Sequence, residues 1–200
     1  MRAMLIPYLK PAVTRMINPI ARGALRIGLT PNAVTAIGAS GVAICALYFY
    51  PREEFFLGTL LIVFFALSDL FDGAMARISK RGASLWGSFL DSTIDRITDS
   101  AIMVGLLLAL IASDDRLTPV ALGALVAGLL VPYIRAKAES LNIECSGGIA
   151  ERTERLMIIL TAIGFHGLGV SYILMFGIWI LFLLSIITVV QRALIVKAAS

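Results

Sequence analysis

The chain has 200 residues, of which 59% are hydrophobic and 15% are charged, and its mean hydropathy is +0.93. So few charges cannot cover the surface of a soluble globule of this size, which excludes an ordinary soluble domain and predicts an integral membrane protein. The net charge of +4 comes without interleaved aromatic and basic residues, so we expect attraction to anionic lipid and no nucleic-acid partner.

An amphipathic segment comes first, over residues 9–27. The apolar side of its helical wheel holds Leu9, Val13, Met16, Ile17, Ile20, Ala24 and Ile27, and the basic side holds Lys10, Arg15, Arg22 and Arg26. This pattern is typical of an interfacial helix that lies on a bilayer with its basic side chains toward the headgroups. We expect it to anchor the protein, and a direct part in catalysis is the less favoured alternative.

Apolar segments long enough to cross a bilayer fill the rest of the chain, within 31–195. The predicted transmembrane helices are 33–50, 55–77, 86–113, 117–138, 154–166 and 170–194. The uncharged run 156–191 is longer than one helix needs to cross ~30 Å of hydrocarbon, and a turn near Gly167 divides it. The predicted fold is therefore an all-α integral membrane protein of six transmembrane helices, with residues 1–200 as one domain.

The positions of Lys and Arg predict the orientation of these helices. With six spans both termini share one side, which collects nearly all the basic residues, whereas Arg52 and Arg116 fall on the other side. Loops that carry an excess of Lys and Arg stay in the cytoplasm. We expect a multi-pass protein of the cell (plasma) membrane with both termini in the cytoplasm.

Four aspartates interrupt this apolar sequence close to the expected cytoplasmic side. Asp69 and Asp72 are three residues apart on the second predicted span, and Asp91 and Asp95 are four apart on the third, so each pair shares a helix face. An aspartate in a span costs about 2.5–3.5 kcal/mol at the membrane centre, which makes a purely structural role for all four improbable. The sequence therefore predicts that something compensates their charge.

A divalent cation is the compensation that the residue types favour. Clustered carboxylates without Cys or His are hard oxygen ligands, which suit Mg²⁺, Mn²⁺ or Ca²⁺ better than zinc. Four of them could hold two ions that clamp phosphoryl oxygens. Gly73, Ala76 and Gly87 leave room for a bulky group, and Arg77 could meet phosphate charge. These features together indicate phosphoryl-transfer chemistry.

The aspartates stand in two motifs, "DLFDGAMAR" (69–77) and "GSFLDSTID" (87–95). Their spacing resembles the signature of the CDP-alcohol phosphotransferases, except that nine residues separate Arg77 from Gly87 where the familiar form has eight. The extra residue falls in the loop between the helices and leaves both faces intact.

The resemblance implies transfer of the phosphatidyl group from CDP-diacylglycerol to an alcohol, with release of CMP. It also implies that Asp69, Asp72 and Asp91 bind two divalent metal ions, and that Asp95 is the general base and a further candidate metal ligand. The residues expected to hold CDP-diacylglycerol are Pro31, Asn32, Ala33, Val34, Gly73, Ala76, Arg77, Ser84 and Gly87. Helix capping explains Pro31–Val34 almost as well. A homodimer is also expected from the family.

The acceptor alcohol is predicted from the stretch "LDSTIDRITD" (90–99), which resembles the inositol-lipid branch of the family and, with "YIRAKAES" and "ERTERL", the actinobacterial phosphatidylinositol phosphate synthases. The acceptor would then be inositol 1-phosphate. A basic pocket for its phosphate is expected from Arg135, Lys137, Arg155 and Arg192. This family typically has Lys-Ala-Arg where the chain has Arg-Ala-Lys (135–137), and ordinary positive-inside charge is the alternative explanation for each residue. Asp99 extends the aspartate stripe, with Arg96 as its expected partner.

Other functions stay open from the residues alone. A phosphatidylglycerophosphate synthase would share the chemistry but use glycerol 3-phosphate, and a related enzyme would use serine. A divalent-cation transporter is the alternative of another class, because acidic residues in spans also mark ion paths. A transporter should carry acidic residues toward both faces, whereas here they gather toward one.

Overall fold

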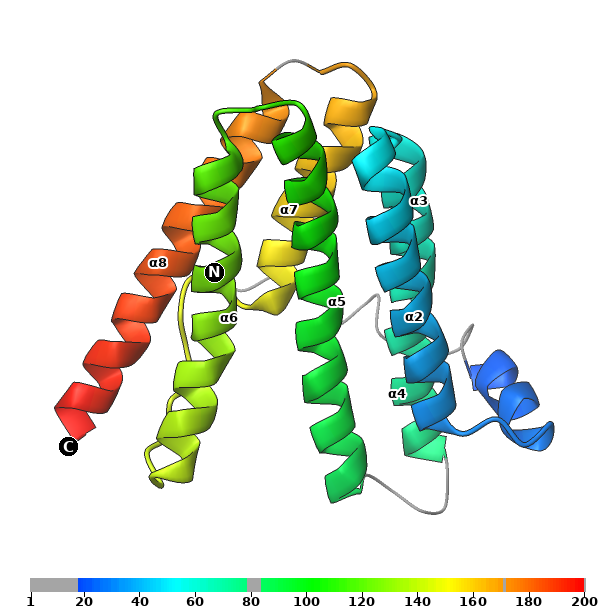
Figure 1. Ribbon diagram of the computed structural model, residues 1–200. Coiled ribbons are helices and arrows are strands. Elements are labelled where there is room, and N and C mark those ends of the chain that lie inside the picture. The colour runs from blue at the N-terminus through cyan, green and yellow to red at the C-terminus, as the bar shows by residue number, and fades with distance from the viewer. Residues whose placement is uncertain (1–17, 79–83, 171, 200) are drawn as a thin grey trace, which may run out of the picture. The chain divides into compact units, whose positions relative to one another are not determined.

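A computed structural model describes residues 18–78, 84–170 and 172–199, without the side chains of residues 69, 70, 72, 76 and 77. This part of the chain is helical and contains no strand, which confirms the predicted all-α class (Figure 1). A helical segment over residues 18–26 comes first. The helices that follow are α2 (Pro31–Phe49), a 3₁₀ turn (Tyr50–Arg52), α3 (Phe55–Ala66), α4 (Ser68–Ile78), α5 (Leu85–Ala112), α6 (Thr118–Ser140), α7 (Arg152–Gly167) and α8 (Ile173–Ala199).

Three stretches of the described chain are long and apolar enough to cross a membrane: Pro31–Arg52, Thr118–Ser140 and Ile173–Ala199. The apolar helix α3 is shorter. Large apolar side chains lie exposed along these helices, among them Ile44, Phe64, Val126 and Leu183. Exposed apolar side chains in such numbers are costly in water and favourable in lipid, so the molecule has the surface of a membrane protein.

The second predicted span, 55–77, is interrupted in the structure. α3 ends at Ala66 and α4 begins at Ser68, with Leu67 between them. A Cβ atom built on Gly38 of α2 would meet the Ser68 side chain and would lie 3.1 Å from the Phe65 carbonyl oxygen. The backbone of α2 therefore approaches this part of the chain closely at the interruption.

The chain divides into two compact units, and the first comprises the described residues of Met1–Ala43 and Ile62–Thr98. One buried cluster of this unit joins Ala21 of the N-terminal helical segment to Ala74 and Met75 of α4. This cluster packs the helical segment 18–26 against α4. Ile20 and Ile27 of the predicted apolar side remain exposed, and residues 9–17 lie outside the described residues.

The second unit comprises Ile44–Leu61 and Asp99–Ser200. Within it α8 packs along both α6 and α7 (Figure 1). Gly177 of α8 and Ala162 of α7 allow these two helices to approach closely, because a Cβ atom on Gly177 would collide with the Ala162 side chain. The Tyr50 and Thr59 hydroxyls form a buried hydrogen bond of 2.9 Å in the same unit.

Candidate active site

The first aspartate motif lies on α4. The helix runs from Ser68 to Ile78, so Asp69, Asp72, Gly73 and Ala76 have the helical spacing that the sequence predicted. The side chains of Asp69, Asp72, Ala76 and Arg77 lie outside the described residues. The described side chains by themselves form no group of three or more metal-binding residues, and two of the four predicted ligands are not among them.

The second motif lies in the first half of α5. Asp91 is exposed, and Asp95, one turn later, is partly buried with 20% of its side chain exposed. An Asp95 carboxylate oxygen lies 3.6 Å from an Arg96 guanidinium nitrogen. Asp95 therefore has a cationic neighbour and a partly accessible carboxylate. A general base must lie within hydrogen-bond reach of the proton that it abstracts, and partial exposure permits this.

The starts of α2 and α5 approach each other within the first unit. Ser84 caps α5, since its hydroxyl oxygen accepts a hydrogen bond of 2.9 Å from the Gly87 N–H. A Cβ atom on Gly87 would lie 3.1 Å from that hydroxyl and 3.6 Å from the Asn32 side-chain oxygen. Three residues predicted to hold CDP-diacylglycerol thus come together.

The capping explanation for Pro31–Val34 also has direct support. The Thr30 hydroxyl oxygen accepts a hydrogen bond of 3.2 Å from the Ala33 N–H, and Pro31 is the first residue of α2. The helix start is thereby fixed without a ligand. Backbone contact with a nucleotide stays a prediction.

The four basic residues predicted to bind the acceptor phosphate fall into two kinds. Arg135 and Lys137 are exposed on α6, and the Arg135 side chain forms an ion pair of 2.8 Å with Glu139 one turn later. Arg155 and Arg192 are buried. The Arg155 guanidinium donates a hydrogen bond of 3.1 Å to the Ala150 carbonyl oxygen.

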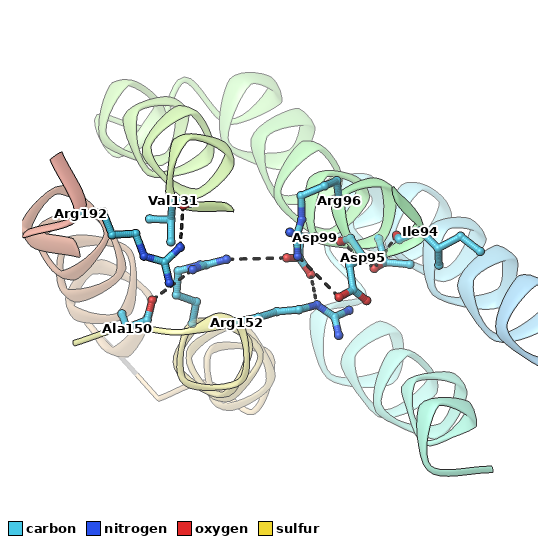
Figure 2. Close-up of polar contacts among 10 residues, drawn as sticks. Ile94, Asp95, Arg96, Asp99, Val131, Ala150, Arg152 and Arg192 are labelled. Carbon is cyan, nitrogen blue, oxygen red and sulfur yellow. Dashed lines mark hydrogen bonds and ion pairs between the residues drawn. The ribbon is translucent and has the colours of Figure 1, made fainter. Parts of the chain in front are cut away.

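Arg192 is held from two sides by backbone carbonyl groups. Its Nε–H donates to the Gly147 oxygen at 2.9 Å, and Nη1 donates to the Val131 oxygen at 2.7 Å, as Figure 2 shows for Val131. Arg192 therefore connects α8 to α6 and to the loop 141–151. The sequence predicted its basic character and did not predict this structural role, because the partners are 45 and 61 residues away.

Two neighbouring α8 residues hold the same loop. The Thr188 hydroxyl accepts a hydrogen bond from the Ala150 N–H, and the Gln191 side-chain oxygen accepts one from the Ile149 N–H, both at 3.2 Å. Thr188, Gln191 and Arg192 share one face of α8. They fix the loop that leads directly into Arg152 and the first turn of α7.

Asp99 contacts both arginines of the first turn of α7, Arg152 and Arg155. Its Oδ1 lies 3.2 Å from Arg152 Nε (Figure 2). Its Oδ2 lies 3.9 Å from Arg155 Nη2. Sequence reasoning did not find this cluster, because Asp99 and Arg152 are 53 residues apart. The only available indication was that Asp99 continues the spacing of Asp91 and Asp95.

Comparison with known proteins decides the family. The family model for CDP-alcohol phosphatidyltransferases matches residues 28–191, which include both aspartate motifs. The chain belongs to the CDP-alcohol phosphatidyltransferase family. The resemblance seen in the sequence is confirmed, and the protein is a CDP-diacylglycerol-dependent phosphatidyltransferase by family. This membership removes the support for the cation-transporter alternative.

Relatives of this phosphatidyltransferase match along nearly the whole chain. The phosphatidylinositol phosphate synthase of Streptomyces avermitilis is 41% identical over 208 residues, which cover 100% of this chain and 85% of that protein. The phosphatidylinositol phosphate synthase of Mycobacterium tuberculosis is 41% identical over 193 residues, which cover 94% of this chain and 88% of that protein.

Solved structures agree with the sequence relatives. A crystal structure of the Mycobacterium tuberculosis phosphatidylinositol phosphate synthase with CDP-DAG bound matches with a TM-score of 0.85 and 42% identity, covering 91% of this chain and 94% of that one. The same enzyme in complex with manganese and citrate matches with a TM-score of 0.85 and 41% identity, covering 90% and 88%.

Proposed function

We propose that this phosphatidyltransferase is a phosphatidylinositol phosphate synthase, which transfers the phosphatidyl group of CDP-diacylglycerol to inositol 1-phosphate and releases CMP. The observation that carries the proposal is the 41% identity, over essentially the whole chain, to a relative of that name. The match to a crystal structure of such a synthase with CDP-DAG bound supports the donor substrate.

The proposed metal ligands are Asp69, Asp72, Asp91 and Asp95, and the proposed occupants are two Mg²⁺ or Mn²⁺ ions. The donor set fits these ions, because carboxylate oxygens are the hard ligands that they prefer. The relative solved with manganese supports a divalent metal. When bound, such ions neutralise the charge that develops on the phosphate oxygens.

Asp95 is proposed as the general base. Its carboxylate accepts the proton of the acceptor hydroxyl while that oxygen attacks the β-phosphorus, and CMP leaves with the electrons of the broken P–O bond. The partial exposure of the Asp95 side chain and its place in the second aspartate motif support this assignment, because a general base must lie within reach of the hydroxyl whose proton it abstracts.

The proposed donor site lies around the ends of α2, α4 and α5. Its residues are Pro31, Asn32, Ala33, Val34, Gly73, Ala76, Arg77, Ser84 and Gly87. The approach of Asn32, Ser84 and Gly87 to one another supports a shared site.

The proposed acceptor site uses Arg135, Lys137, Arg155 and Arg192 to bind the phosphate of inositol 1-phosphate. Guanidinium groups suit this task because their planar N–H donors match phosphate oxygens in pairs. Arg155 is the best supported phosphate ligand of the four, because Ala150 and Asp99 hold its side chain in place at the start of α7.

The proposed setting is the plasma membrane, with residues 1–200 as one domain, six spans within 31–195, a 9–27 interfacial helix and a homodimeric assembly. The distribution of Lys and Arg supports an active site and termini in the cytoplasm. The exposed Ile20 and Ile27 support contact of the N-terminal helix with lipid.

The proposal is tested by CMP release from the purified protein in detergent with CDP-diacylglycerol and Mg²⁺. Inositol 1-phosphate, inositol, glycerol 3-phosphate and serine are supplied separately. We expect release with inositol 1-phosphate alone. Release with glycerol 3-phosphate instead would preserve the family chemistry and refute the acceptor assignment, and release with free inositol at the same rate would refute a phosphate-binding acceptor site.

A further inference from the structure

The structure gives Asp99 a position that the aspartate motif does not explain. Asp99 follows Asp95 by one turn of α5, and its two carboxylate oxygens point to two different arginines of α7. Oδ1 accepts a hydrogen bond from the Arg152 Nε–H (Figure 2). Oδ2 lies near the Arg155 guanidinium. One carboxylate therefore fixes both cations of the first α7 turn.

The environment of Arg155 explains why such a carboxylate is needed. Arg155 is buried with only 7% of its surface exposed, and it uses one guanidinium nitrogen on the Ala150 carbonyl. Burying a cation is costly unless it is paired and hydrogen-bonded. Asp99 places negative charge near Nη2, the other terminal nitrogen of the Arg155 guanidinium. This charge stabilises the buried Arg155 side chain.

We infer that Asp99 is a positioning residue, which orients Arg152 and Arg155 to receive the phosphate of the acceptor without touching that phosphate itself. This inference rests on the proposed function. An anionic acceptor is repelled by Asp99, so the carboxylate acts only through the arginines. Because the Arg152 and Arg155 side chains are already ordered at the start of α7, they lose less conformational entropy when the phosphate binds.

The test is Asp99→Asn, which keeps the size of the side chain and removes its charge. Because Arg152 and Arg155 lose the negative charge of their shared partner, we expect the KM for inositol 1-phosphate to rise about tenfold or more, with the KM for CDP-diacylglycerol unchanged. Asp99→Glu should restore part of the affinity. If Asp99 acts through Arg155, the double variant D99N/R155A should be little worse than R155A alone.

Asp114→Asn is the matched control, since Asp114 is exposed and has a backbone φ of 50°, which Asn adopts readily. A lower KM for inositol 1-phosphate in Asp99→Asn would mean that Asp99 is only a counter-charge, and equal changes in both KM values would mean a general structural role. Either result, or no change, overturns the inference. Wild-type activity with another acceptor would instead refute the proposed function, which keeps the two failures distinct.

Discussion

The proposed phosphatidyl transfer depends most directly on Asp95, whose carboxylate is the proposed general base. Asp95→Asn keeps the shape of the side chain and removes its ability to accept a proton, so we expect kcat to fall by about 10²-fold or more. Binding of CDP-diacylglycerol and the elution volume on gel filtration should remain as in the wild type. A variant that releases CMP at close to the normal rate would refute Asp95 as the base.

Arg155 is expected to control acceptor affinity. Arg155→Ala removes the proposed phosphate ligand, so the KM for inositol 1-phosphate should rise by far more than the KM for CDP-diacylglycerol, by about tenfold or more. Arg155→Lys should recover little, because a lysine has no planar pair of donors. Arg116→Ala, an exposed arginine between α5 and α6, is the control and should leave both constants unchanged.

At this scale the sequence predicted residue types well and partners poorly. The helical period predicted that each aspartate pair shares one face of a helix. The structure places Asp69 and Asp72 on α4 and Asp91 and Asp95 on α5, as predicted. The partners of Arg155 and Arg192 are set by the path of the loop 141–151. That path depends on contacts between distant parts of the chain, which no local pattern encodes.

Among the elements, the loop 141–151 depends on a pair of adjacent glycines. Gly147 and Gly148 have φ angles of 127° and 122°, and a Cβ atom on Gly148 would lie 2.5 Å from the Thr188 methyl carbon, whereas nothing lies within 4 Å of one on Gly147. Either alanine should cost about 1–3 kcal/mol, because a residue with a Cβ atom rarely adopts these φ angles. Gly148→Ala should cost roughly a further 1–3 kcal/mol for the collision.

Thermal unfolding in detergent compares these two variants directly. Gly147→Ala is the matched control, because it shares the strained backbone conformation and lacks the collision with Thr188. We expect Gly148→Ala to have the lower Tm and also a raised KM for inositol 1-phosphate. Equal Tm values would show that the contact between this loop and α8 adds nothing to stability.

Helix ends illustrate how far local sequence determines the elements. Thr30 and Pro31 mark the start of α2 in the sequence, and the structure begins the helix there because the cap satisfies its first N–H groups. The interruption at Leu67 is marked only by Ser68, a residue type that favours helix starts, because neither Gly nor Pro lies beside it. It occurs where Gly38 brings the α2 backbone against Ser68, which is a tertiary effect.

For the whole molecule, cysteine labelling in intact cells tests the proposed orientation. The native Cys45 and Cys145 are 5% and 1% exposed, so they contribute little background. Ser113→Cys and Ser140→Cys lie in exposed positions at the α5 end and the α6 end. A membrane-impermeant maleimide should label Ser113→Cys from outside and Ser140→Cys only after permeabilisation. The reverse pattern would place the termini outside the cell.

Removal of metal is expected to affect both activity and stability. EDTA should abolish CMP release, and Mg²⁺ or Mn²⁺ should restore it, because the clustered carboxylates need compensating charge. A metal present at 100 times its Kd stabilises the native state by about 2.7 kcal/mol, so Tm should fall with EDTA in the wild type. Full activity in EDTA would refute the metal site.

The attachment of the loop 141–151 to α8 also bears on how the protein is made. Thr188, Gln191 and Arg192 follow their partners in the loop by 38 to 45 residues, so the ribosome adds them long after the loop and α7 have been synthesised. The aspartate motifs are complete much earlier. A growing chain therefore carries its aspartates without the anchors that fix the start of α7 until α8 has been synthesised.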